Sequence, residues 1–471
     1  MIVKSVLLDK KYYKLVDETY CNVENAFTVI VGSNGTGKSR LLKRVVNNIK
    51  NVHYSRKKIP TNYSKQIEFE LNGKSLYYFS PVNETKSFIG ADKSKAELAS
   101  DDLKVIAVTT TPFDKFPIEN KGLKEPFRYF DEKNYTYIGL KTSKNTLNQS
   151  NYLNLLARSI LKNDQILKNE YLFNLLNLKP TCSVKFKTKF PISDYFIYKY
   201  TSTGDKSRVE WEVSLFKADL ISYYSTLGEK ILNSPKLGLT FKAFKEVVKH
   251  LKNPISLKNN EVNKYALLYL LDIGLINVED FIFHDFNSKS EIKSSELSSG
   301  QKCMILTVLN IAGSIDDGAV VCIDEPEISL HPKWQKEYVN VLIKFFNTYK
   351  RCHFIIATHS PLIISELSSE NCHILNMDDG TAYSSMKYRS TSSDLQLAEV
   401  FGVAGNNNEY LNRIVVSLLS KLSLENSLDD NEIKQLNSLI NLSKQMNDDD
   451  HVKSLIDILS LAWSKVSSNA R

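Results

Sequence analysis

A glycine-rich octapeptide near the N-terminus has the residue types and the spacing of a phosphate-binding loop. Its sequence is GSNGTGKS, and it lies between the apolar run 26–31 and helix-spaced apolar residues over 38–49. Glycines let backbone N–H groups turn toward phosphate oxygens, and the following helix N-terminus adds its positive dipole end. Lys38 should reach the β- and γ-phosphates of ATP, and Ser39 should bind Mg²⁺. The predicted nucleotide-binding residues here are Gly32, Ser33, Asn34, Gly35, Thr36, Gly37, Lys38, Ser39 and Arg40.

Two adjacent carboxylates follow a second apolar run. Residues 320–323 have the pattern of a buried strand, and this strand ends in Asp324 and Glu325. A strand that delivers acids at its C-terminal end is typical of a Walker B element. We expect Asp324 to hold Mg²⁺, directly or through water, and Glu325 to polarise the attacking water as general base. The alternative is a solvated pair of acids in the loop after a strand.

Two further polar segments border apolar elements. Residues 297–302, LSSGQK, precede an apolar helix, and residues 354–361, FIIATHSP, form a strand that ends in a polar turn with His359. The serines can cap the helix with their hydroxyls. They can also bind an anion together with the N–H groups of the helix N-terminus. A single histidine at a strand end is usually structural, so His359 is a candidate because of its place behind the other motifs.

The four motifs, in this order, resemble those of ABC-type ATPases, with a serine in place of the first glycine of the signature peptide. In that family, the signature of one protomer contacts the γ-phosphate held by the other protomer's Walker A, and a switch histidine senses that phosphate. The resemblance therefore implies two catalytic residues, Glu325 and His359, in a site closed by two copies of the chain. It also implies nucleotide contacts from Ser298, Ser299, Gly300 and Gln301.

Two more segments matter for this resemblance. Residues 325–332, EPEISLHP, fill the position of the D-loop, which lies at the dimer interface of the family. A Q-loop glutamine is not found. The segment 109–116, which follows a buried strand, is the candidate to replace it.

Within the ABC-type ATPases, the sequence excludes some classes and favours one. No apolar run approaches the roughly 18–20 residues that cross a bilayer, and Lys38 lies too far from Gly300 for a transporter cassette. Residues 150–290 lack the sustained heptads of SMC-type arms. DEPEISLHP followed by ATHSP resembles the OLD-like ATPases of bacterial defence systems, but residues 380–471 offer no Toprim-like acidic cluster. The chain is most similar to the PtuA-type ATPases of Septu and some retron systems, which act with a separate HNH nuclease.

This resemblance implies an ATP-binding and hydrolysing subunit of a bacterial antiphage complex in the cytoplasm. It implies ATP and Mg²⁺ as cofactors, at least two copies of the chain, and a separate HNH nuclease as partner. A stand-alone DNA-processing or DNA-repair ATPase or nuclease of the OLD or SMC-like type is the alternative. The basic, aromatic stretch 179–199 either contacts the backbone of a nucleic acid or forms a hairpin with a solvated basic face.

Composition and patterning predict an α/β fold. The 471 residues are 42% hydrophobic, which is enough for two or three lobes, and carry a net charge of +8. Six scattered cysteines without a CxxC pair argue against a disulfide framework or a zinc site. No membrane segment or secretory signal is expected.

We expect four regions in an ABC-type, P-loop NTPase fold. Residues 1–120 form the N-terminal ATPase lobe, 121–290 a mixed insertion, 291–390 the C-terminal ATPase lobe, and 391–471 a helical tail. In the insertion, a β-hairpin region over 181–215 separates helical stretches at 150–180 and 216–275. The tail either serves as an arm for a partner or packs on the catalytic domain. Its acidic run 448–450 is expected to be a solvated linker between helices.

Overall fold

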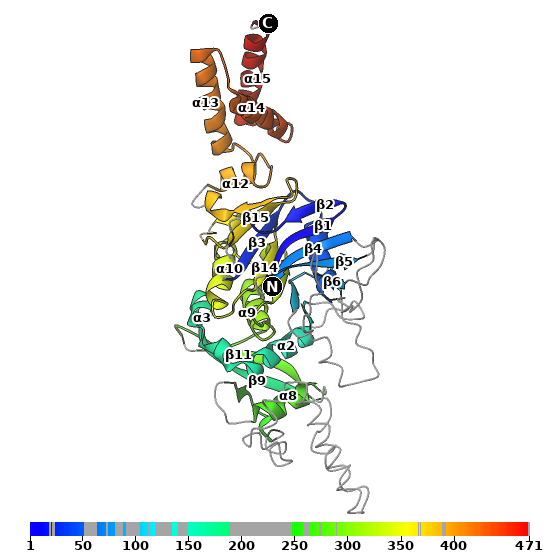
Figure 1. The fold of residues 1–471 in the computed structure, drawn as a ribbon. Helices are drawn as coiled ribbons and strands as arrows, with labels where there is room; N and C mark the ends of the chain where they lie inside the picture. The colour runs from blue at the N-terminus through cyan, green and yellow to red at the C-terminus, as the bar shows by residue number, and fades with distance from the viewer. Residues whose placement is uncertain are drawn as a thin grey trace, which may run out of the picture.

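The computed structural model describes residues 1–17, 20, 24–50, 64–71, 74–80, 88–90, 104–111, 114–117, 134–139, 149–188, 247, 249–257, 263–272, 276–288, 290–365, 367, 369–388 and 392–469. They form three β-sheets, helices on both faces of the largest sheet, and a group of helices at the C-terminal end (Figure 1). In these ranges no helix combines the length and apolar character needed to span a bilayer. The cysteines in these ranges are buried and form no disulfide, as predicted: Cys182, Cys303, Cys322, Cys352 and Cys372.

A seven-stranded sheet forms the centre of the head, in the order β16-β15-β3-β14-β13-β7-β8. Six strands run parallel, and β16 pairs antiparallel at one edge. The central strands are apolar and buried on both faces, which is typical of a covered parallel sheet. Their carboxyl ends therefore share one edge. The strands are β3 (Ala26–Val31), β7 (Val105–Thr109), β8 (Tyr135–Ile138), β13 (Val320–Asp324), β14 (His353–Ala357), β15 (Cys372–Asn376) and β16 (Ala382–Ser384).

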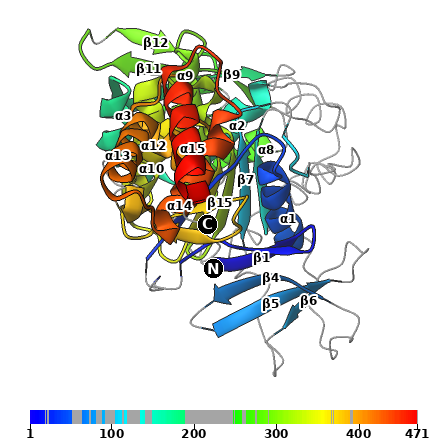
Figure 2. The same cartoon turned by 90° about the horizontal axis from the view of Figure 1, so that it is seen from above.

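Two layers cover this sheet. On one face α1 (Lys38–Lys50) packs together with a five-stranded antiparallel sheet of order β2-β1-β4-β5-β6, which stands out from the head beside α1 in Figure 2. On the other face pack α2 (Gln149–Lys162), α9 (Ser299–Ala312) and α10 (Pro332–Phe345). The smaller sheet consists of β1 (Ile2–Leu8), β2 (Lys11–Lys14), β4 (Ser64–Leu71), β5 (Lys74–Ser80) and β6 (Phe88–Gly90).

A buried histidine joins the two sheets. His353 at the start of β14 accepts the backbone N–H of Val3 on its Nδ1 at 3.1 Å, and its Nε2 lies 2.8 Å from Thr28 Oγ1. Because the Val3 bond requires a bare Nδ1, the proton is on Nε2, which donates to Thr28. The Thr28 hydroxyl in turn donates to the Leu15 carbonyl at 2.6 Å. The ring is therefore neutral, and protonation would break the bond to β1.

The insertion contains a four-stranded sheet of order β10-β9-β11-β12, whose strand β11 packs on α2, and α2 in turn packs against α9. The prediction of a strand region after residue 180 is only partly right, because β9 begins at Leu178 and its described partners are β10 and β11. Alternation shows that a strand exists but not which distant strand it pairs with. The expected hairpin beyond residue 188 lies outside the described residues. The elements are η3 (Asp164–Lys168), α3 (Glu170–Leu175), β9 (Leu178–Thr188), β10 (Ile255–Ser256), α8 (Lys264–Asp272), β11 (Ile276–Asp285) and β12 (Glu291–Lys293).

The C-terminal helices form an arm with a core of its own. α13 (Glu409–Glu425), α14 (Asp430–Ser443) and α15 (His451–Asn469) bury one shared apolar cluster that is separate from the clusters of the head. They project from the head beyond η5 (Ser385–Tyr388) and α12 (Ser393–Glu399) (Figure 1). The acidic run 448–450 is not simply a solvated linker. Asp450 is buried and accepts the backbone N–H groups of Val452 and Asn407, so it fastens the start of α15 to the arm.

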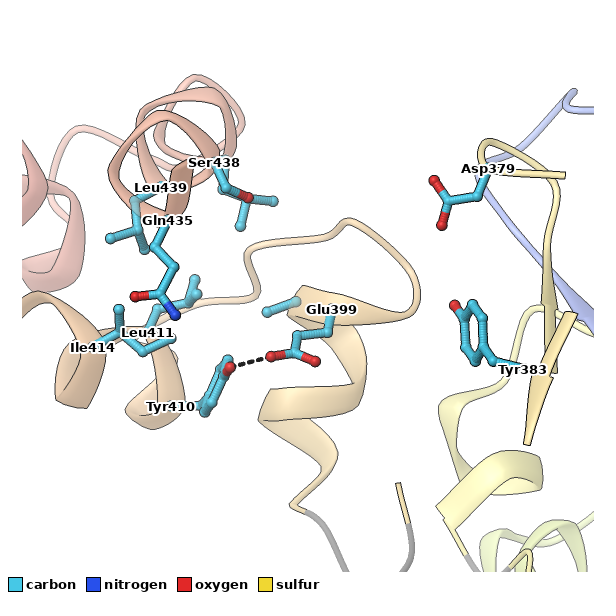
Figure 3. Close-up of a pocket in the computed structure, with 11 residues that line it drawn as sticks. Asp379, Tyr383, Glu399, Tyr410, Leu411, Ile414, Gln435, Ser438 and Leu439 are labelled. Carbon is cyan, nitrogen blue, oxygen red and sulfur yellow. Dashed lines mark hydrogen bonds between the residues drawn. The ribbon is translucent and has the colours of Figure 1, made fainter. Parts of the chain in front are cut away.

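A cavity of about 360 Å³ lies where the arm meets the head. Figure 3 shows Asp379 and Tyr383 of the head facing Glu399 of α12 and Tyr410 of α13. The Tyr410 hydroxyl donates to the Glu399 carboxylate across part of this space. The residues that line it include none of the predicted nucleotide-binding residues.

Buried histidines make the head sensitive to acid. Burial lowers the pKa of His353 well below 6.5, and burial lowers the pKa of His373 to about 4. Below pH 6.5 these two histidines therefore bind protons in the unfolded chain but not in the folded chain, so the stability that they contribute falls as the pH decreases toward 4. We expect this contribution to be fully present above that range, and the part that comes from His373 to fall by about 2 kcal/mol at pH 5, measured by urea unfolding against variants that lack the ring.

The His353→Gln variant should be less stable at pH 7.5 and should lose stability less steeply on acidification. His451→Gln, at an exposed position, is the control and should follow the wild-type curve. An unchanged pH slope in His353→Gln would show that this histidine does not titrate on unfolding.

The arm should unfold without the head when its own core is damaged. Ile456 of α15 is fully buried, whereas Leu461 of the same helix is 64% exposed. Ile456→Ala removes buried methylene groups and should destabilise the arm by about 2–5 kcal/mol, while Leu461→Ala should have almost no effect. Limited proteolysis should cut Ile456→Ala in 409–469 and leave a stable head; simultaneous loss of the head would contradict an independent core.

Candidate active site

The glycine-rich loop follows β3 and wraps around the start of α1. Gly32 has a φ of 144° and Gly37 a φ of 104°, which are backbone angles that residues other than glycine rarely adopt. The Lys38 ammonium is folded over the loop and donates to the carbonyls of Gly32 and Ser33 at 2.7 and 3.0 Å. Burial lowers the pKa of Lys38, and the charges of Glu325, Glu327 and Asp324 oppose this shift.

The acid that ends β13 meets this loop directly. Ser39 Oγ donates to Asp324 Oδ1 at 3.0 Å, although the two residues are far apart in the sequence. Burial raises the pKa of Asp324 to about 7, with the like charges of Glu325, Asp114 and Glu327 adding to the shift and the Ser39 bond opposing it. The Ser39 hydroxyl and the Asp324 carboxylate are both oxygen donors, and a cation beside them would stabilise the charged carboxylate. This pair therefore fits Mg²⁺, which prefers hard oxygen ligands.

The described residues contain no group of three or more His, Cys, Asp or Glu side chains arranged to hold a metal by themselves. In nucleotide sites, one or two protein oxygens usually hold Mg²⁺, and phosphates and water complete its coordination. Ser39 and Asp324 are the residues that would hold the ion.

Glu325 and His359 face each other beside this pair. Glu325 has a left-handed φ of 50°, and its N–H donates to the carbonyl of Ala357 at 2.9 Å, so the chain turns sharply after β13. Its Oε1 lies 3.7 Å from His359 Nε2, and both side chains are about one-third exposed. Burial lowers the pKa of His359, as does the charge of Lys38, while Glu325 opposes the shift. A neutral imidazole beside a solvent-accessible carboxylate suits water activation.

The segment that was the candidate Q-loop replacement lies at the same edge. β7 pairs with β13 so that Thr109 is opposite Asp324, and the Thr110 hydroxyl donates to the Glu325 carbonyl at 3.4 Å.

The side chain that the sequence did not single out is Asp114. It is buried and accepts hydrogen bonds at 2.9 Å from the Phe116 N–H and the Tyr137 hydroxyl. The sequence signal for it was weak, because one acid in a loop is common.

The signature peptide begins α9. Ser298 caps the helix in a reciprocal capping box with Gln301, whose Nε2 also donates to the carbonyl of Leu176 in the insertion at 3.1 Å. Gly300 packs so tightly that a Cβ would lie 2.5 Å from the ring of Trp334. Both serines are exposed.

The structure therefore divides the predicted residues into two groups. The first group gathers at one edge of the sheet and contains the loop Gly32–Ser39, Asp324, Glu325 and His359. The signature residues form the second group, and their hydrogen bonds within the described part of the chain do not reach the glycine-rich loop. Arg40 lies beside the first group: its guanidinium packs over Gly37, where an added Cβ would lie 3.0 Å from it, and pairs with exposed Asp9 at 2.8 Å.

Comparison with known proteins finds a matching family and several similar sequences. A model of the AAA ATPase domain family matches residues 1–364. A probable ATPase of retron Vc95 from Vibrio cholerae is 37% identical over 98 residues, which cover 18% of this chain and 18% of the relative. A probable ATPase of retron Ec83 from Escherichia coli is 30% identical over 121 residues, covering 23% and 21%. The Septu protein PtuA from Bacillus mycoides is 27% identical over 189 residues, covering 37% and 25%.

The aligned segments thus span about a fifth to a quarter of the length of these curated relatives. Among solved structures, the Smc head domain from Pyrococcus furiosus, which was crystallised with a domain of ScpA, covers 82% of this chain and 97% of its own. It is 12% identical with a TM-score of 0.30. The resemblance to retron and Septu ATPases expected from the motifs is confirmed, as is the α/β ATPase fold with a mixed insertion and helical tail. Since the family model covers most of its length, the chain belongs to the AAA ATPase domain family.

Proposed function

We propose that this chain is the ATP-binding and hydrolysing subunit of a cytoplasmic bacterial antiphage complex and controls a separate HNH-type nuclease. The observation that carries the ATPase part is the meeting of Lys38, Ser39, Asp324, Glu325 and His359 at one edge of the parallel sheet. The antiphage part is supported by the relatives, which are ATPases of retrons and a Septu protein.

Each side chain has one role in hydrolysis. Lys38 and the loop N–H groups bind the phosphates, and Glu325 accepts the proton of the attacking water. His359, held neutral beside Glu325, orients that water and contacts the γ-phosphate. Mg²⁺, bound by Ser39 and Asp324, would neutralise the phosphate charge that builds up in the reaction.

The arrangement of the signature favours a head-to-tail dimer. Ser298 and Ser299 expose their hydroxyls at the N-terminus of α9, where N–H groups and the helix dipole attract an anion. Their hydrogen bonds within the described part of the chain do not reach the glycine-rich loop, so we propose that a second copy supplies them to complete the site. Two copies would then form two equivalent sites.

The effector part of the proposal is tested by expressing the chain from its native operon and identifying the proteins that copurify by mass spectrometry. An HNH nuclease in fixed stoichiometry is the expected result. A homo-oligomer without such a partner, together with Mg²⁺-dependent DNA cleavage by the pure chain, would instead support the stand-alone DNA-processing alternative.

Lys38→Ala should weaken ATP binding by about 100-fold, because two charge-assisted hydrogen bonds to phosphate are lost. A fluorescent ATP analogue measures this affinity. Lys43→Ala, on the exposed face of the same helix, is the matched control and should bind as the wild type does. If Lys38→Ala binds ATP as tightly as the wild type does, this lysine does not bind the phosphates.

Glu325→Gln should keep ATP affinity and lower kcat by about 10²–10⁴-fold, because an amide of the same shape cannot accept the proton. The variant should accumulate as an ATP-bound dimer in light scattering. Adding Ser298→Arg, which places a bulky side chain at the signature, should abolish that dimer. If Glu325→Gln hydrolyses ATP at the wild-type rate, Glu325 is not the base. If its molecular mass in light scattering does not change with ATP, head-to-tail closure is contradicted.

A further inference from the structure

Glu327 holds the backbone of the residue proposed as the switch histidine. It lies in the 3₁₀ helix η4 (Pro326–Ser329), two residues beyond Glu325. Its Oε1 accepts the backbone N–H of His359 at 2.6 Å. Its Oε2 is buried, and burial raises the pKa of the carboxyl group, while the His359 N–H and the Thr358 hydroxyl oppose this shift. Glutamine at this position would keep an acceptor in the same place and would avoid the cost of burying a carboxylate.

Gln335 of α10 braces the same two segments from behind. Its Nε2 donates to the carbonyls of Glu327 at 3.3 Å and Leu330 at 3.0 Å. Its Oε1 accepts the hydroxyl of Ser360 at 2.6 Å. One amide therefore joins η4 to the turn after β14, so the two segments have little freedom to move separately.

The position of the His359 ring depends on this brace. His359 lies in the turn after β14, where regular strand pairing has ended and the neighbouring hydrogen bonds are made by side chains. The bond to Glu327 fixes its backbone, and the bond between Ser360 and Gln335 fixes the next residue. With both in place, His359 Nε2 remains 3.7 Å from Glu325 Oε1.

We propose that Glu327 is a positioning residue that holds His359 against the catalytic Glu325, with Gln335 as its brace. This inference rests on the proposed ATPase function and deepens it. The carboxylate contacts the backbone of His359 and not the reacting atoms, so its role is carried out through the histidine. The requirement is a hydrogen-bond acceptor at Oε1, and glutamine at position 327 would provide one.

The first test compares three variants in steady-state ATP hydrolysis. Glu327→Leu should lower kcat by about 100-fold, as expected for a misplaced catalytic group, with ATP affinity unchanged. Glu327→Gln should remain within about twofold of the wild type, since its Oε1 still accepts the N–H. Glu425→Leu, at an exposed position on the arm, is the control for the substitution itself. Equal loss in Glu327→Gln and Glu327→Leu would show that the charge acts directly, which overturns a positioning role.

The second test is a double-mutant cycle with His359→Ala, which distinguishes positioning from general support of the fold. If Glu327 acts through His359, adding Glu327→Leu to His359→Ala should change kcat by no more than about twofold. Multiplied losses would overturn the proposal.

Two further measurements are needed to interpret the double-mutant cycle. ATP affinity and the thermal midpoint of every variant report whether the site and the fold are intact. If His359→Ala hydrolyses ATP at the wild-type rate, the histidine has no switch role, and there is no reason for Glu327 to position it. If His359→Ala lowers kcat and Glu327→Leu multiplies that loss, the proposed ATPase function would stand. Only the positioning role of Glu327 would then be rejected.

Discussion

The alignment of four parallel strands is the constraint on which the rest of the site depends. β3, β14, β13 and β7 lie side by side with their carboxyl ends at one edge, and the residue pairs Asp324–Ala357 and Asp324–Thr109 set that edge. A one-residue slip of β13 would move its acid away from the glycine-rich loop and turn its apolar side chains toward the wrong core. Burial on both faces makes such a slip costly.

The layers around the sheet keep this alignment and connect it to the insertion. His353 ties the start of β14 to β1 and β3, so the smaller sheet cannot shift without breaking a buried bond. On the opposite face, Gln301 bonds to Leu176, and Gly300 lies against Trp334. The helix that begins with the exposed serines is thus fixed both to the insertion and to α10.

The sequence predicted the strands and helices of the head well because each carries a strong local pattern. The glycine loop, the acids after β13 and His359 all follow apolar runs, and the parallel sheet then brings their ends together. What the sequence did not show depends on contacts between distant segments. The pairing of β9 with β11 and the burial of Asp450 are of this kind. Arg40 belongs to the loop motif, yet it lies beside Asp9 because the β1–β2 turn brings an acid within reach.

The charge balance of the site favours the Mg²⁺ proposed to accompany the nucleotide. Asp114, Glu325 and Glu327 all raise the pKa of Asp324, and Lys38 is the ammonium that faces these carboxylates. A bare triphosphate would meet this negative cluster and be repelled, in spite of the N–H groups of the loop. Mg²⁺ between Asp324 and the phosphates would reverse that repulsion, and the exposed helix N-terminus of a second copy would add positive potential from the other side. In the proposed dimer, nucleotide binding and closure would therefore be favoured by the same electrostatic interactions.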